Sequence, residues 1–215
     1  MKPQDFVELY GRQRGSAILR WDDQETAARA MDAAARGGFR VLEFTLTVPG
    51  AFELIEEFSR KDGVVVGAGT VLDVRDAERA VRSGARFLVS PVTDPEVIAA
   101  CASLEVAAMP GTHTPTEMLA AYRAGAQLQK LFPAPGLGPA YVQACRGPMP
   151  FLNIVPTNGV TVENARAWLE AGAFALGFVN PLFEPRDLER KDFDAIEERA
   201  RRIRASLDAA AAAGP

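Results

Sequence analysis

The feature that most constrains the fold of this chain is a short pattern that occurs four times. Each copy has a small residue, a glycine and a small or aromatic residue, followed by a short β-type run and then a proline. The central glycines are Gly38, Gly84, Gly125 and Gly172, at intervals of 46, 41 and 47 residues. Because glycine tolerates the positive φ at which many helices end, each copy is interpreted as a helix end followed by a strand.

Four further β-type runs lie between or before these copies, at residues 16–20, 64–67, 106–111 and 151–159. Helical stretches fill the gaps, for example at residues 23–35, 73–83, 95–103, 116–124 and 162–171. Several begin at Asp, Thr or Pro and end near glycine, as helices do. Eight strands that alternate with eight helices predict an α/β fold, a closed (β/α)8 TIM barrel, because an all-parallel sheet needs its faces covered.

The length of 215 residues fits a minimal barrel, since such barrels have about 250 residues and rarely fewer than roughly 200. We therefore predict a single TIM-barrel domain over residues 1–215. Residues 1–14 are expected to form an extra N-terminal helix that caps the barrel, and residues 206–215 an Ala-rich helical tail that frays. An open doubly wound sheet is the alternative, but no dinucleotide-type glycine fingerprint follows the first strand.

The composition argues against several classes of protein. A hydrophobic fraction of 48% predicts a folded core, and a net charge of −4 argues against a general nucleic-acid or membrane-surface binder. No apolar run approaches the roughly 18 residues that cross a bilayer, and none follows the charged start as in a secretory signal. Cys101 and Cys145 are expected to be free thiols, as in a cytoplasmic protein. The single histidine, His113, is expected at a turn and leaves no multi-histidine metal site.

Lysine is rare in this chain, which makes one of its positions informative. The 24 basic residues are twenty Arg and four Lys, and only Lys130 lies in an alternating run, between Leu128 and Phe132. Inside a barrel its amine would be desolvated, which lowers the pKa and yields a neutral nucleophile. The alternative is a stem that packs while the ammonium reaches solvent. The same alternation points Gln127 and Gln129 at the helices, where the sequence suggests no partner.

Glu43 is a second polar residue on a predicted inward face. It shares that face with Val41 and Thr45, whereas the residues between them are apolar and face the helices. A buried carboxylate needs a partner or a chemical role. We expect either a structural ion pair with Lys130 or a general acid/base beside a nucleophilic amine, and both interpretations place the two side chains together.

Other polar residues follow the strands, at the end where barrel enzymes place their active sites. Arg20 could hold a carboxylate in a bidentate contact, or form a surface ion pair with Asp22 or Asp23. Glycines before Thr70 allow the backbone to approach a ligand. The residues at the place where barrels often bind phosphate are Thr157, Asn158, Gly159 and Asn180.

As an ordered set, these motifs resemble the 2-keto-3-deoxy-6-phosphogluconate (KDPG) / 4-hydroxy-2-oxoglutarate aldolases. The matching segments are residues 17–20, 41–46, 66–72, 87–91, 110–112, 130–134 and 156–160. The resemblance implies a class I aldolase that cleaves a 2-keto-4-hydroxy acid to pyruvate and an aldehyde, without a metal or a cofactor. It also implies a homotrimer and a place in carbohydrate metabolism of the Entner-Doudoroff type.

The resemblance further assigns roles to individual residues. Lys130 would form the Schiff base and Glu43 would transfer protons. The implied contacts to the pyruvate half and its carboxylate are Arg20, Thr70, Pro91 and Phe132. Two other functions stay open: a metal-dependent pyruvate aldolase in which Glu43 holds Mg²⁺, and a barrel that binds phosphorylated or acidic ligands without turnover.

Three positions depart from the well-known KDPG aldolases. Thr47 stands where they have Arg, Asn158 where they have the first of two glycines, and Val179-Asn180 where they have Gly-Ser. A branched side chain limits backbone approach, and two side-chain amides replace part of a nest of backbone N–H groups. We therefore expect the pyruvate half of the substrate to be retained and the aldehyde half to be altered or non-phosphorylated.

Overall fold

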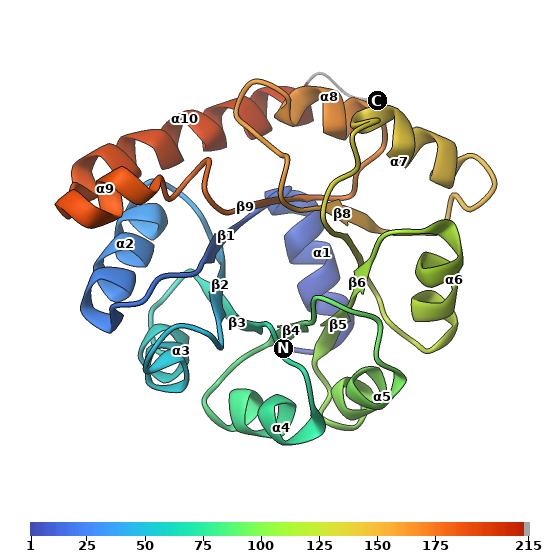
Figure 1. Cartoon of the computed structure of the whole chain (residues 1–215), viewed down its shortest axis with the longest axis horizontal. Helices are drawn as coiled ribbons and strands as arrows, with labels where there is room; N and C mark the ends of the chain where they lie inside the picture. Colours follow the sequence, from blue (N-terminus) through green and yellow to red (C-terminus); the bar gives the residue numbers. More distant parts are fainter. Residues whose placement is uncertain (213–215) are drawn as a thin grey trace.

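The computed structural model describes residues 1–212, so the last residues of the predicted tail, 213–215, lie outside the described part. Within residues 1–212 the chain forms ten helices and nine strands, and the strands surround a common centre (Figure 1). In chain order the elements are α1 (Pro3–Gln13), β1 (Gly15–Leu19), α2 (Gln24–Arg36), β2 (Val41–Thr45), α3 (Ala51–Ser59), β3 (Val65–Gly69), α4 (Val74–Arg82), β4 (Phe87–Val89), α5 (Pro95–Ser103), β5 (Ala107–Met109), β6 (Gly111–Thr112), α6 (Pro115–Arg123), β7 (Gln129–Leu131), α7 (Pro139–Arg146), β8 (Ile154–Pro156), α8 (Ala165–Glu170), β9 (Leu176–Phe178), α9 (Pro185–Arg190) and α10 (Phe193–Ala212).

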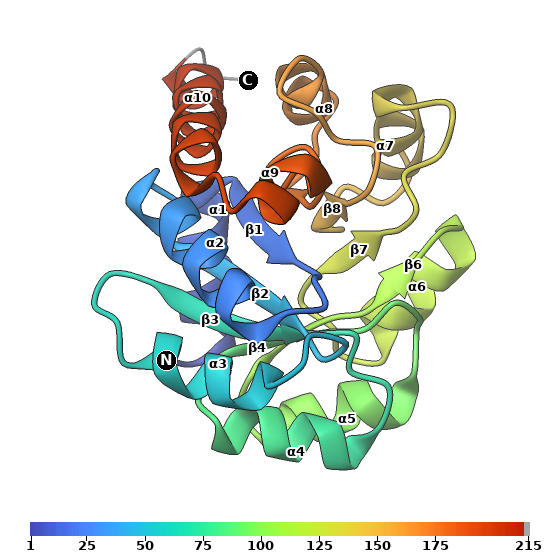
Figure 2. The same ribbon diagram turned by 60° about the vertical axis from the view of Figure 1, so that its left-hand side comes forward.

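The strands pair in parallel and form two sheets. The larger sheet has the order β5-β4-β3-β2-β1-β9 and forms half of a barrel, and the smaller sheet has the order β6-β7-β8. Most helices lie outside the strands, with α10 packed against α2 and α8 (Figures 1 and 2). This is the alternating α/β arrangement that the glycine repeat predicts.

The fifth predicted strand is divided into β5 and β6. Pro110 lies between them and has no N–H to donate, although its carbonyl accepts a hydrogen bond from the β7 backbone at 2.9 Å. The two sheets adjoin here and again at β8 and β9. At this second junction the Phe174 amide donates to the Ile154 carbonyl at 2.8 Å, and Thr157 forms a parallel bridge with Gly177.

Gln127 and Gln129 supply hydrogen bonds between neighbouring strands, which explains their positions. The side-chain oxygen of Gln127 accepts from the Ala108 amide at 2.9 Å, and that of Gln129 accepts from the Asn153 amide at 3.0 Å. Gln129 is fully buried, and its side-chain amide also donates to the Ala126 carbonyl at 3.2 Å. Side-chain amides thus replace backbone partners where the ladders of β6, β7 and β8 are short.

The repeated glycines end helices, as predicted. Gly38, Gly84, Gly125 and Gly172 have φ values of 107°, 107°, 101° and 95°, in a region that residues with a Cβ avoid. At the opposite ends, side-chain oxygens accept hydrogen bonds from free amides of the first turn. The capping residues of this kind are Asp23, Asp73, Asp94 and Thr114.

The extra N-terminal helix is α1, which lies against the amino-terminal ends of the strands. Pro3 stands in its first turn, and Asp5 accepts a hydrogen bond from the Lys2 amide at 2.9 Å. Phe6 and Tyr10 on its apolar face are fully buried. With inward-facing strand residues they form one cluster, called the floor below: Phe6, Val7, Tyr10, Val41, Phe87, Val89, Ala107, Met109, Leu128, Val155 and Ala175.

A second and larger core fills the space between the strands and the outer helices. Leu42 and Phe44 of β2 belong to it, so the residues on either side of Glu43 point outward as predicted. Cys101 and Cys145 are free and buried. Within the described part of the chain, no helix combines the length and the apolar character needed to cross a membrane.

Candidate active site

A cavity of about 320 Å³ opens at the carboxyl ends of the strands. Its lining residues are Ile18, Arg20, Thr45, Thr70, Pro91, Lys130, Phe132, Thr157, Asn158, Val160, Gly177, Val179, Asn180 and Pro181. Eight of the ten predicted site residues are among them, and the two that are not are Glu43 and Gly159. Residues in or just after seven different strands therefore meet in one place, as the barrel interpretation requires.

Lys130 lies at the base of this cavity, in the middle of β7. Its side chain is only 8% exposed, and its ammonium nitrogen lies 5.0 Å from the centre of the Phe132 ring. The strand is also held in place by the Thr112 hydroxyl, which donates to the Lys130 carbonyl at 3.1 Å. Burial lowers the pKa of Lys130, and the negative charge of Glu43 opposes this shift. Lys130 therefore does not reach solvent as a surface lysine does.

Glu43 lies beneath the cavity on the inward face of β2 and is fully buried. In the sheet register it is level with Ile18 of β1 and Gly67 of β3. Neither carboxyl oxygen has a hydrogen-bond partner among the described residues, so no hydrogen-bonded ion pair joins it to Lys130. Burial raises the pKa of Glu43, and the positive charges of Lys130 and Arg20 oppose this shift.

Burial thus moves Lys130 and Glu43 toward their uncharged forms. The amine gains nucleophilic character and the carboxylic acid gains a proton that it can donate. A deeply buried amine and a buried, unpartnered carboxyl group below one cavity are typical of an active site rather than of a structural core.

Arg20 contacts Thr70 rather than the aspartates that follow it in the sequence. Its guanidinium donates to the Thr70 hydroxyl at 3.4 Å, whereas Asp23 accepts from the Thr26 amide at 2.8 Å as a helix cap. Thr70 has a φ of 61°, which is strained for a β-branched residue. The strained backbone brings the Thr70 hydroxyl to the guanidinium, and both groups line the cavity.

Thr157 contributes a second unpartnered polar group to the site. Its hydroxyl is buried and has no hydrogen-bond partner among the described residues. The hydroxyl lies beside Gly177: a Cβ added to Gly177 would be only 2.5 Å from Thr157 Oγ1. Sequence reasoning included Thr157 but missed Gly177, because only the bridge between the two strand ends brings them together.

The distal end of the cavity is lined by two side-chain amides, Asn158 and Asn180, together with Val179. Both asparagines are exposed, and Gly159 faces Ala134 instead of the cavity. The segment that carries Asn180 is held by Arg199 of α10, which donates to the Leu182 carbonyl at 3.0 Å. Arg20 and Lys130 are the only basic side chains among the lining residues.

Thr47 and His113 lie outside the cavity lining. The Thr47 hydroxyl is 2.8 Å from that of Thr45, which does line the cavity. His113 precedes the cap of α6 and is exposed, with Nδ1 lying 3.0 Å from the Pro133 carbonyl oxygen. His113 therefore lies in the connection between β6 and α6.

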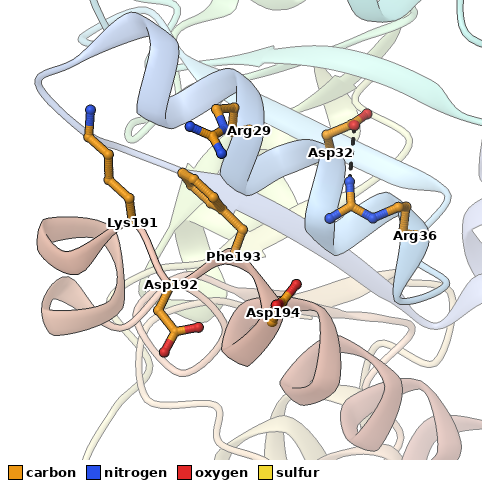
Figure 3. Close-up of a pocket in the computed structure, with 7 residues that line it drawn as sticks. All are labelled: Arg29, Asp32, Arg36, Lys191, Asp192, Phe193 and Asp194. Carbon is orange, nitrogen blue, oxygen red and sulfur yellow. Dashed lines mark hydrogen bonds and ion pairs between the residues drawn. The ribbon is translucent and has the colours of Figure 1, made fainter.

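A second hollow, of about 360 Å³, lies on the outside between α2 and the start of α10 (Figure 3). Arg36 contacts Asp32 of the same helix at 3.2 Å, and the guanidinium of Arg29 lies 4.3 Å from the centre of the Phe193 ring at the start of α10. The lining of this hollow contains neither Lys130 nor Glu43. Within residues 1–212 no group of three or more His, Cys, Asp or Glu side chains could hold a metal ion. The interior cavity is therefore the candidate active site.

Comparisons with known proteins show which family the chain belongs to. A family model for KDPG and KHG aldolase matches residues 12–199. A probable 2-dehydro-3-deoxy-6-phosphogalactonate aldolase of Rhizobium meliloti (strain 1021) is 38% identical over 172 residues, which are 79% of this chain and 81% of that protein. A solved structure named native KDPGal has a TM-score of 0.84 at 27% identity, over 92% of this chain and 96% of that one. A cube-shaped, highly porous protein cage, designed by fusing symmetric oligomeric domains, has a TM-score of 0.81 at 28% identity over 92% of this chain and 74% of that one. The chain therefore belongs to the KDPG and KHG aldolase family.

Proposed function

We propose that this chain is a class I aldolase that cleaves a 2-keto-4-hydroxy acid to pyruvate and an aldehyde through a Schiff base at Lys130. The observation that carries the proposal is the position of Lys130: an almost fully buried amine, with a lowered pKa, at the base of the cavity. The buried carboxyl group of Glu43, with its raised pKa, is the proton donor and acceptor. Membership of the family agrees with this chemistry.

The first step forms the imine. The neutral Lys130 amine bonds to the C2 ketone carbon, and the ketone oxygen leaves as water. This oxygen takes one proton from the amine and one from the Glu43 carboxylic acid, directly or through one water. The products are a protonated imine and a Glu43 carboxylate, which is then ready to act as a base.

The second step breaks the C3–C4 bond. The Glu43 carboxylate accepts the proton of the C4 hydroxyl, and the electron pair of the O–H bond forms the second bond of the aldehyde carbonyl. The C3–C4 electron pair becomes a C2–C3 double bond, while the imine electrons move to the nitrogen. Glu43 then returns its proton to C3 of the enamine. Water hydrolyses the protonated imine: its oxygen becomes the pyruvate ketone, one of its protons goes to the Lys130 nitrogen, and the other goes to the Glu43 carboxylate, so that both groups return to their starting forms.

The pyruvate half has a matching set of contacts. Arg20, steadied by the Thr70 hydroxyl, holds the carboxylate, which is the only charged group of that half. Pro91 and Phe132 provide apolar surface beside Lys130 and exclude water from the imine. Burial and the positive charge of Arg20 both lower the pKa of Lys130, which favours the neutral amine that attacks the ketone.

The aldehyde half lies toward Asn158, Val179 and Asn180. The Rhizobium meliloti relative is named for a phosphorylated substrate, whereas this chain places two amides and a branched side chain at the distal end. We retain the prediction that the aldehyde half is altered or non-phosphorylated. Turnover of KDPG, its galactonate epimer and the unphosphorylated acids, measured side by side, tests it. Similar kcat/KM values support the prediction, and a strong preference for a phosphorylated acid contradicts it.

We further propose that the two sheets close into one (β/α)8 barrel, and that residues 1–215 form one domain. The hydrogen bonds at the β5–β7 and β8–β9 junctions support closure. A cytoplasmic homotrimer that serves an Entner-Doudoroff type of pathway completes the proposal. Similarity to a cage built from symmetric oligomeric domains supports self-association, and light scattering of the purified protein tests for a mass of three chains.

One experiment separates the proposed function from its alternatives. The protein is incubated with pyruvate and borohydride, with and without EDTA, and its mass is measured. An adduct at Lys130 that EDTA does not affect supports the Schiff-base mechanism. Activity that EDTA abolishes, with no adduct, supports a metal-dependent aldolase. Absence of both an adduct and cleavage supports a barrel that binds acids without turnover.

A further inference from the structure

The Glu43 side chain does not stay at the level of its own Cα. In the sheet register Glu43 is opposite Gly67 of β3, and Gly69 is opposite Thr45. A Cβ placed on Gly69 would nevertheless lie 2.9 Å from Cδ of Glu43 and 3.1 Å from its Cγ, and would overlap Oε1. The side chain therefore leans one layer toward the carboxyl ends of the strands, over Gly69 and toward the cavity.

Hydrogen bonds do not hold the carboxyl group in this place. Both of its oxygens are buried, and neither has a partner among the described residues. The charges that act on it are those of Lys130 from β7 and Arg20 from the end of β1, with the Tyr10 hydroxyl group of α1 as the other titratable neighbour. The remaining restraint is the shape of the space, and the bare backbone of Gly69 is one wall of that space.

Gly67 provides a comparison within the same strand. It also lacks a side chain on the inward face, but the space is filled by the Phe87 ring, whose atoms lie 2.5 Å from where a Cβ would be. That ring stacks on Phe6 of α1, with centres 4.4 Å apart and planes 13° from parallel. Two glycines, two residues apart, thus make room for different groups: a hydrocarbon ring at Gly67 and the carboxyl group at Gly69.

The backbone at Gly69 cannot easily move away from an added side chain. Its carbonyl accepts a hydrogen bond from the Leu46 amide at 2.8 Å, and the Val71 amide two residues later donates to the Val89 carbonyl at 3.0 Å. Neighbouring strands therefore hold β3 on both sides of its end. A methyl group at position 69 would displace the Glu43 carboxyl group rather than the strand.

We propose that Gly69 is a positioning residue for proton transfer. Because Gly69 has no side chain, it leaves a space that the Glu43 carboxyl group occupies, and from this space the carboxyl group reaches the reacting carbons. This inference rests on the proposed function, because it assigns the proton transfers to Glu43. Gly69 itself touches no substrate in this account. It acts through the place it leaves for Glu43, and the attack of Lys130 on the ketone does not depend on it in the same way.

The test separates Schiff-base formation from proton transfer on one substrate, pyruvate. Borohydride trapping reports the bond between Lys130 and C2. Exchange of the pyruvate methyl protons in D₂O, followed by NMR, reports proton removal from C3 of the same imine. For Gly69→Ala we expect the trapped fraction of the wild type once imine formation has reached equilibrium, because a displaced Glu43 slows the loss of the ketone oxygen without changing that equilibrium. Exchange should be slowed about 100-fold, the loss typical of a catalytic group displaced by about 1 Å. Gly136→Ala is the matched control, since a Cβ there has no atom within 4 Å, and both readouts should stay at wild-type levels.

A shorter carboxylate provides the decisive comparison. The side chain of the Glu43→Asp variant ends one methylene earlier, so its carboxyl carbon takes the place of Glu43 Cγ, 3.1 Å from the added Cβ, and the overlap is smaller than with Glu43. Adding Gly69→Ala to Glu43→Asp should therefore slow exchange by much less than it does in the wild type. The thermal midpoint gives a second readout, because Gly69→Ala should lower it in the wild type and not in a Glu43→Ala background.

The outcomes distinguish this inference from the proposed function. Three results would overturn the positioning role. In the first, Gly69→Ala slows exchange equally in the wild-type and Glu43→Asp backgrounds. In the second, Gly69→Ala abolishes trapping together with exchange, and in the third the Gly69→Ala protein exchanges like the wild type. A wild-type protein that neither traps nor exchanges pyruvate would instead overturn the proposed aldolase function.

Discussion

The floor and the cavity above it are built on the same strands, yet their polar atoms have different surroundings. At the level of the floor, the buried hydroxyl of Tyr10 lies 2.7 Å from that of Ser16, and each satisfies the other. One layer higher, both oxygens of Glu43 and the hydroxyl of Thr157 lack partners among the described residues. Unpaired buried polar groups lower the free energy of unfolding, so the layer that contains Glu43 and Thr157 makes the fold less stable. The comparison teaches that one end of the strands is arranged for packing, and that the other end leaves polar groups free for the proposed chemistry.

The largest expected effect is on the upper layer, at Lys130. Lys130→Arg should fold but abolish trapping of pyruvate, because a guanidinium stays protonated and cannot form an imine. The control is Lys61→Arg, since Lys61 forms a surface ion pair with Asp32 at 2.6 Å. Mass spectrometry after borohydride treatment is the measurement. An adduct in Lys130→Arg would show that chemistry is not confined to this position.

The matching change in the floor is Phe6→Ala. Phe6 is fully buried and stacks on Phe87, so its removal should lower the free energy of unfolding by about 3–5 kcal/mol. Below the melting temperature, trapping per folded molecule should be unchanged. Urea unfolding and trapping on the same samples check both statements, with the exposed Phe151 mutated to Ala as control. Loss of trapping in a folded Phe6→Ala protein would mean that the floor also shapes the site.

Glu43→Gln should increase stability, and more so as the pH rises. The pKa of Glu43 is raised in the folded protein, mainly by burial, so its stabilising contribution is present below about pH 4.3, the ordinary glutamate pKa, and is lost as the pH rises through the folded pKa. The variant should therefore exceed the wild type by about 1–3 kcal/mol at pH 8 and by less at pH 5. Unfolding in urea at both pH values measures this, and a difference that does not depend on pH would contradict it.

The smallest expected effect concerns the satisfied pair in the floor. Tyr10→Phe leaves the Ser16 hydroxyl buried without a partner and should cost about 1 kcal/mol. Combining it with Ser16→Ala removes both polar groups and should recover part of this loss. Free energies of unfolding for the four proteins of this cycle are the measurement. Strictly additive losses would show that the two hydroxyl groups are not coupled.

Much of the fold could be predicted because its signals are local. The φ values of the four repeated glycines mark helix ends, and Pro95–Ser103 is a helix with the predicted bounds. The predicted bounds of an element are wrong where distant residues, or turns formed by side chains, determine where that element begins or ends. The helix predicted from residue 162 begins at Ala165, because the Asn164 side chain accepts from the Thr161 amide at 2.7 Å and forms a turn instead.

The site could be predicted in part for the same reason. Alternation alone placed Lys130 and Glu43 inside, because the side-chain period of a strand is a local property. The contact between Arg20 and Thr70, and the space that Gly69 leaves for Glu43, depend on sheet register and were not predictable from one strand. Contacts across strands need the assembled sheet, whereas the direction of a side chain does not.

The position of α1 has a consequence for the order in which the two products are released. Phe6 and Tyr10 are fully buried in the floor, so packed side chains fill this end of the strands, and we expect substrate, water and both products to pass through the cavity at the other end. In the proposed mechanism the pyruvate carbons remain attached to Lys130 after C3–C4 cleavage. The aldehyde has to depart before hydrolytic water can take its place above the imine. Ordered release, with aldehyde first and pyruvate second, follows from a helix that touches neither product.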